Sequence, residues 1–146
     1  MLTKYWRLRV LNSTDQTLTY NNAARINVRA CPWKLLAGVL TYGTTIVDDM
    51  GLIADGSIAA AAELEGDVQD NSSNVYWGVK GFFEVIADVT STDGTVYLYL
   101  EESDDNTNWP SDGADFAIAS HMTLIAALTL STDAEDEDAS VNFTIN

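Results

Sequence analysis

Apolar and polar residues alternate with a period of two along several short stretches of the chain. From Trp6 to Val10, the apolar side chains lie on one side of an extended chain, and Arg7 and Arg9 lie on the other. The stretch 25–30 repeats the pattern, with three apolar residues on one face and two arginines and an asparagine on the other. This alternation is typical of antiparallel strands with one buried face.

Similar stretches recur along the chain, and turn-forming residues separate them. The Asp93–Gly94 pair gives the strongest hairpin signal. We expect strands over residues 5–10, 16–20, 25–30, 35–42, 51–54, 75–80, 82–90, 95–101, 115–119, 123–131 and 139–145. Residues 57–65 contain four consecutive alanines and favour either one short helix or another strand, because the flanking glycines leave only about nine residues.

The pattern predicts an all-β fold: a single antiparallel β-sandwich domain over residues 1–146, with at most one short helix. The length suits one ordinary domain. A single cysteine excludes an intramolecular disulfide, so packing must stabilise the fold. The first residues mix charges with apolar side chains, and no apolar stretch approaches about 18 residues. We therefore expect a soluble, non-membrane protein made in the cytoplasm.

Charge is distributed unevenly along the chain, whose formal net charge is −15. Residues 1–34 hold six basic residues and one acidic residue, whereas residues 35–146 hold one basic and 21 acidic residues. The overall balance opposes nucleic-acid binding, which relies on clustered cations. The asymmetry indicates a basic face that meets an acidic surface on a neighbouring copy or another protein. Alternatively, the basic strands pair with the acidic strands of their own domain.

The residues needed for catalysis are few. His121 is the only histidine and Cys31 the only cysteine, and the sequence around Cys31 resembles no nucleophile motif. Nucleophile elbows, phosphate loops, zinc helices and dinucleotide fingerprints are absent from the sequence. We expect no enzymatic activity and no cofactor.

One loop has the composition of a calcium site. Oxygen-bearing residues alternate in it at Asp104, Asn106 and Asn108, and further aspartates follow at 112 and 115. However, Trp109 stands where a calcium loop of the helix-loop-helix type needs glycine, and position 115 holds aspartate where that loop needs glutamate. We expect a turn rich in Asp and Asn and no bound metal.

The aromatic residues offer a second candidate chemistry. Trp109 precedes a proline in a polar loop, so we expect its ring to be exposed and able to stack on a sugar. The strand 96–100 is apolar on both faces, which predicts cover within the fold or an interface with another chain.

Residues 70–145 resemble the capsid decoration, or cement, proteins of tailed bacteriophages. The resemblance rests on DNSSNVYWG at 70–78, the apolar strand to residue 90, DGTVYLYL at 93–100, SD at 103–104 and TNWPSDG at 107–113. It implies a jelly-roll-like β-sandwich that assembles by symmetry, as a homotrimer, and clamps neighbouring subunits of the major capsid protein. It transfers no catalytic residue.

The expected function is therefore a structural virion protein that decorates and reinforces the outer surface of a phage capsid. The alternatives are a tail-tube or other self-assembling tail subunit, and a carbohydrate- or surface-binding module. The expected partners are the major capsid protein and other copies of the chain, without nucleic acid or membrane. The residues expected to contact partners are Lys4, Arg7, Arg9, Arg25, Arg29 and Trp109. Reversing the charges of Arg7 and Arg9 is expected to weaken attachment and leave the fold intact.

Overall fold

The computed structural model describes residues 1–20, 25–48, 56–86, 93–110, 122–130 and 138–146, and in these residues the fold is all-β. The strands are β1 (Tyr5–Thr14), β2 (Leu18–Tyr20), β3 (Arg25–Leu36), β4 (Val39–Tyr42), β5 (Ile46–Asp48), β6 (Gly56–Ile58), β7 (Glu63–Glu65), β8 (Gln69–Asp70), β9 (Gly78–Ile86), β10 (Gly94–Ser103), β11 (Thr123–Leu130) and β12 (Asp138–Ile145).

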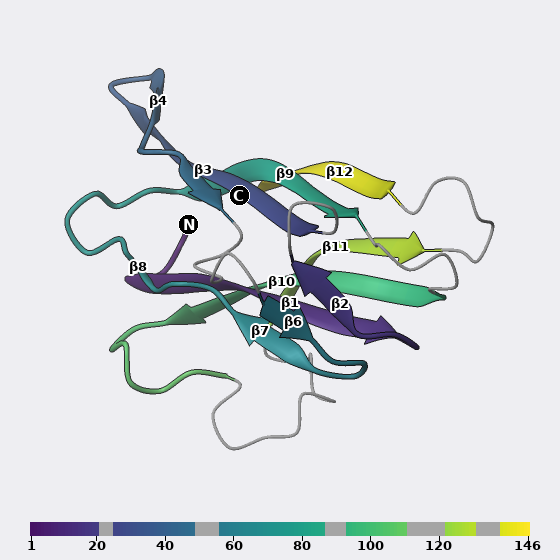
Figure 1. The fold of residues 1–146 in the computed structure, drawn as a ribbon. Coiled ribbons are helices and arrows are strands. Elements are labelled where there is room, and N and C mark those ends of the chain that lie inside the picture. Colours follow the sequence, from purple (N-terminus) through teal and green to yellow (C-terminus); the bar gives the residue numbers. More distant parts are fainter. Residues whose placement is uncertain (21–24, 49–55, 87–92, 111–121, 131–137) are drawn as a thin grey trace.

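Two five-stranded antiparallel sheets pack against each other as a β-sandwich (Figure 1). The β1 sheet has the order β11-β10-β1-β7, and β8 also pairs with β1. The β3 sheet has the order β12-β9-β3-β4, and β5 also pairs with β3. In Figure 1 the β3 sheet forms the upper layer, and β4 projects beyond the sandwich at one end. Strands β2 and β6 form a separate two-stranded ribbon.

The connections between the sheets give the sandwich its jelly-roll-like character. Strands β10 and β11 form a hairpin in the β1 sheet, and the strands that flank them in sequence, β9 and β12, pair in the β3 sheet. On the other side, β1 pairs with β10, and β3 pairs with β9. Pairs of strands thus wrap together around the sandwich, which is the connectivity of jelly rolls. The expected fold class is confirmed.

The core forms where the apolar faces of the two sheets meet. Alternation places Trp6 and Val10 of β1 inward, as the sequence predicts, and β3 does the same with Ile26 and Val28. Each such buried side chain contributes about 1.5–3 kcal/mol relative to an exposed one. The remaining large buried apolar side chains of the long strands are Leu8, Val79, Phe83, Val85, Val96, Leu98, Leu100, Leu128, Leu130 and Phe143.

Three parts of the secondary structure differ from the sequence prediction. Residues 57–65 contain no helix, because strand β6 ends at Ile58, a turn follows in which the Ala62 amide donates to the Ala59 carbonyl (3.1 Å), and β7 begins at Glu63. Residues 35–42, expected as one strand, form the tight end of a hairpin. Residues 78–86 form one strand where two were expected. The expected strands 51–54 and 115–119 lie outside the described residues.

Gly81 is a point of close approach between β9 and its two neighbouring strands. A Cβ atom at this position would collide with the Arg29 carbonyl oxygen of β3, and it would lie 2.6 Å from Cζ of Phe143 on β12. Only glycine fits this position without moving backbone.

We predict that Gly81→Ala lowers the free energy of unfolding by about 1–3 kcal/mol, the usual cost of overpacking. Urea unfolding followed by tryptophan fluorescence measures this difference. Asn142→Ala, at an exposed position on β12, serves as the control and should change stability by less than about 0.5 kcal/mol. Equal stability of Gly81→Ala and the wild type would contradict the packing described for β9.

Candidate functional site

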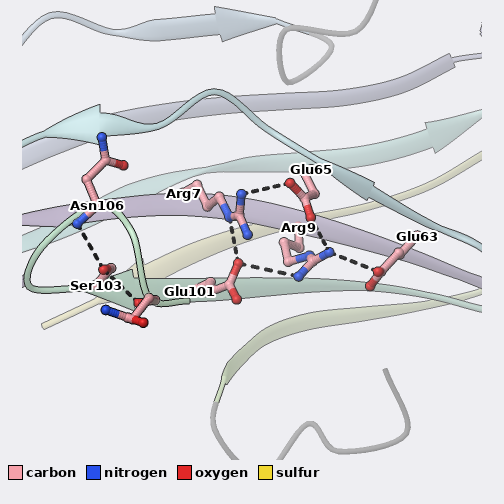
Figure 2. A network of polar contacts seen from close by, with 8 residues as sticks. Arg7, Arg9, Glu63, Glu65, Glu101, Ser103 and Asn106 are labelled. Atoms are coloured by element: carbon pink, nitrogen blue, oxygen red, sulfur yellow. Dashed lines mark hydrogen bonds and ion pairs between the residues drawn. The ribbon is translucent and has the colours of Figure 1, made fainter. Parts of the chain in front are cut away.

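Arg7 lies at the centre of a network of ion pairs on the outer face of the β1 sheet. Its Nε donates to Oε2 of Glu101 at 2.6 Å, and its Nη1 donates to Oε2 of Glu65 at 2.7 Å. Arg7 stands opposite Glu101 in the β1–β10 register, so the pair follows directly from strand pairing. Figure 2 shows these contacts in one row along β1.

Arg9 extends the network by one step along β1. Its Nη2 lies 2.6 Å from Oε1 of Glu65 and 2.9 Å from Oε1 of Glu63, and its Nη1 lies 3.5 Å from Oε2 of Glu101. Arg9 is 2% exposed, and Glu101 is fully buried. Burial raises the pKa of the Glu63 carboxyl, and the charge of Arg9 opposes this increase. The network thus joins β1, β7 and β10.

The structure corrects the expected role of Arg7 and Arg9. Both arginines point away from the core, as alternation predicts, but they pair with carboxylates of their own domain and are buried. This is the cross-strand alternative to a partner-binding face. Reversing either charge would place carboxylates together in a buried site, so on this structure we expect the reversed variant to be less stable rather than to keep its fold intact.

Trp109 covers part of this network. The Arg7 guanidinium lies 4.3 Å from the centre of the Trp109 ring, which is a cation–π distance. Trp109 is half-buried, so it is not the exposed ring expected for sugar stacking.

The other predicted contact residues lie apart from the network. Lys4 is exposed, and its Nζ lies 5.2 Å from the centre of the Tyr5 ring. Arg25 begins β3, and its side chain lies outside the described part of the structure. Arg29 is exposed on the outer face of the β3 sheet. Of the five predicted residues whose side chains are described, Arg7 and Arg9 are buried beside half-buried Trp109, whereas Lys4 and Arg29 are exposed and lie apart from them.

A surface cavity lies on the outer face of the β3 sheet. Its volume is about 360 Å³, and Arg29, Lys80 and Phe82 line it together with residues of β12. The Lys80 ammonium donates to the Tyr42 hydroxyl at 2.9 Å and lies 4.0 Å from the centre of that ring. This contact holds the lysine between the cavity and the end of the β3–β4 hairpin.

Five exposed large apolar residues lie on the hairpin formed by the end of β3 and β4, residues 33–42, which we call the hairpin arm. Ala37 and Gly38 form its turn with positive φ angles of 51° and 82°, as in the type I′ turns of tight hairpins. Leu36 and Val39 flank the turn and are 61% and 65% exposed.

Apolar exposure is concentrated at this end of the sandwich. Seven of the ten exposed large apolar side chains in the described residues lie on the arm or on the adjacent segment 75–77. Contiguous exposed apolar surface marks sites of interaction, whereas single exposed apolar residues do not. The seven residues are Leu35, Leu36, Val39, Leu40, Tyr42, Val75 and Trp77.

Hydrogen bonds anchor the base of the arm to the loop before β9. The Trp77 amide donates to the Trp33 carbonyl at 2.8 Å, and the Lys34 ammonium donates to the Asn74 carbonyl at 2.6 Å. Within that loop, the side chain of buried Asn71 accepts from the Tyr76 amide at 2.6 Å and donates to the Tyr76 and Thr3 carbonyls. The arm therefore projects from a fixed base.

The loop at residues 103–108 is a turn held by its own side chains. The Asp105 carboxylate accepts from the amides of Thr107 and Asn108 at 2.9 Å, and the Asn108 side chain donates to it at 2.6 Å. These hydrogen bonds hold the pKa of Asp105 well below its usual range. Figure 2 shows Asn106 beside Ser103, whose hydroxyl accepts from the Asn106 amide.

Other candidate chemistries are not assembled in the described part of the chain. It contains no group of three or more potential metal-ligating side chains, and Asp112 and Asp115 lie outside it. Cys31 is half-buried on β3, and His121 lies outside the described residues. No helix in this part is long and apolar enough to span a membrane.

Comparison with known proteins finds no matching family model, no matching curated protein and no matching solved structure. The function must therefore be argued from the surfaces themselves.

Sequence reasoning missed the hairpin arm as a site. The available signal was the run LLAGVL at 35–40, in which apolar pairs flank an Ala-Gly turn. It also missed Glu63, Glu65 and Glu101 as the partners of the arginines. The acidic residues at 63 and 65 alternate along a short strand, and this spacing was the available signal.

We predict that Glu101→Gln lowers the free energy of unfolding by about 3–5 kcal/mol, because it removes the buried charge shared by two arginines. Glu63→Gln removes one contact at the exposed end of the network and should cost about 1 kcal/mol or less. Denaturant unfolding of both variants measures the difference. Equal costs would show that burial of the network does not govern its contribution.

Proposed function

We propose that this chain is a structural virion protein that decorates the outside of a phage capsid and reinforces it by binding between major capsid subunits. The observation that carries the proposal is the hairpin arm, an apolar projection on an otherwise strongly acidic domain. The resemblance of residues 70–145 to capsid decoration proteins supports the choice of partner.

The arm is apolar on both of its faces. Leu35 stands opposite Leu40, and Leu36 stands opposite Val39, so the alternation of strand side chains places the two pairs on opposite faces. A flat partner surface would cover only one of these faces. A crevice between neighbouring subunits would cover both, and a capsid offers such crevices at regular spacing.

Attachment to a repeating shell also explains how a small contact can suffice. Each arm offers only a few apolar side chains, but a protein with several arms engages several crevices at once. Multivalent binding of this kind exceeds the affinity of a single contact by a factor of about 10²–10⁴. Binding between subunits then links them mechanically without a chemical step.

We predict that Leu36→Ser reduces binding to purified shells by about tenfold or more, because burial of one leucine is worth about 1.5–3 kcal/mol. Co-sedimentation with shells that lack this protein measures the bound fraction. Leu36 is exposed in the free chain, so the variant should unfold at the wild-type temperature.

The matched control is Leu124→Ser on β11. Leu124 is a 53% exposed leucine on the other sheet, so its replacement removes similar apolar surface away from the arm. It should bind shells as the wild type does. Equal loss in both variants, or no loss in Leu36→Ser, would refute attachment through the arm. Rings or tubes formed by the protein alone, and lost in Leu36→Ser, would favour a tail-tube subunit instead.

A further inference from the structure

The outer face of the β3 sheet gathers exposed cations in a chain of net charge −15. Arg29 on β3 and Lys80 on β9 lie on this face, which we call the cationic face, and both line the same cavity. They occupy neighbouring register positions, because Arg29 stands opposite Phe82 and Lys80 opposite Cys31. Neither forms an ion pair with the side chains that the structure describes.

Exposed positive charge is concentrated on this face because other basic side chains are buried or bound elsewhere. Arg7 and Arg9 are buried in the network of the β1 sheet, so they add nothing to the outer surface. Lys34 lies at the base of the arm, at the edge of the same sheet. Among the described side chains, most of the positive charge that other molecules can reach therefore lies on and beside one sheet.

The cationic face continues into apolar surface. A second cavity of about 210 Å³ is lined by Trp33, Leu40 and Tyr42 of the arm together with Lys80 and Thr144. Lys80 and Thr144 line both cavities, so the two surfaces are contiguous. A partner that fits here presents carboxylates toward the cations and apolar contacts toward the arm.

We infer that the cationic face docks a second copy of this chain through an acidic surface of that copy. The copy has the required charge, because 22 acidic residues face only seven basic ones in each chain. The contact joins two different surfaces, so it is head-to-tail and closes into a ring when the rotation between copies permits. The inference extends the proposed function to the neighbouring copy but is measurable without a shell.

The two faces of the arm then have separate uses. The face of Leu35 and Leu40 joins the groove beside Lys80 and contacts the neighbouring copy. The opposite face, with Leu36 and Val39, remains available to the shell. A crevice with the neighbouring copy as one wall and a capsid subunit as the other would therefore cover both apolar faces of the arm.

Light scattering at 0.15 M salt tests the inference through the mass of the particle in solution. At this salt the Debye length is about 8 Å, so repulsion between the acidic bodies is screened while contacting charges still attract. The wild type should have a mass of at least twice 15.9 kDa, the mass of one chain. At 1 M salt the Debye length is about 3 Å, and the mass should fall toward that of one chain.

Arg29→Glu should remain a single chain at both salt concentrations. Lys4→Glu changes the net charge equally at an exposed lysine outside this face, and it should keep the wild-type mass. Lys80→Glu on the neighbouring strand repeats the test should Arg29→Glu fail to fold. A single-chain wild type at 0.15 M salt, or unchanged mass in the folded face variant, would overturn the inference. Normal mass with lost shell binding in Leu36→Ser would separate this contact from the arm's attachment.

Discussion

The burial of two arginines against one face of the β1 sheet is the constraint on which the rest of the molecule depends. A buried guanidinium is tolerated only with carboxylates at hydrogen-bonding distance, and the buried Glu101 lies between Arg7 and Arg9. The carboxylates that pair with the arginines come from β7 and β10, which flank β1 on its two sides. The two arginines on the outer face of this sheet are thereby covered by side chains of the same domain, with the Trp109 ring against Arg7.

Because Arg7 and Arg9 are buried within the β1 sheet, the proposed partner contacts fall on the β3 sheet. The β3 sheet carries exposed Arg29 and Lys80, two cavities and the hairpin arm, whose base is held by hydrogen bonds to the loop before β9. Under the proposed function, a sandwich that binds its neighbours through the arm and the cationic face suits a subunit that transmits force between them. In this account the acidic body provides both solubility and the complement to the cationic face.

The strand pattern was predictable because alternation records which side of a strand faces the core. Trp6 and Val10 on β1 and Ile26 and Val28 on β3 follow it directly. Alternation alone does not show whether the opposite face of a strand is covered. The burial of Arg7 and Arg9 could therefore be predicted only with knowledge of the strands that lie beside β1. The arm was not predicted for another reason. Residues 35–40 are apolar on both faces, so this segment lacks the alternation by which the separate strands of a hairpin are recognised. In its turn both Ala37 and Gly38 have positive φ angles, and in the sequence only the glycine indicates such a conformation.

Under the proposed function, residues 33–42 are the part of the chain that becomes buried on the particle. Hydrogen–deuterium exchange of the free protein and of the protein bound to shells compares this segment with Thr123–Leu130 of β11 in one experiment. The account predicts that exchange slows in residues 33–42 on binding and stays unchanged across β11. Unchanged exchange in residues 33–42 of shell-bound protein would contradict it.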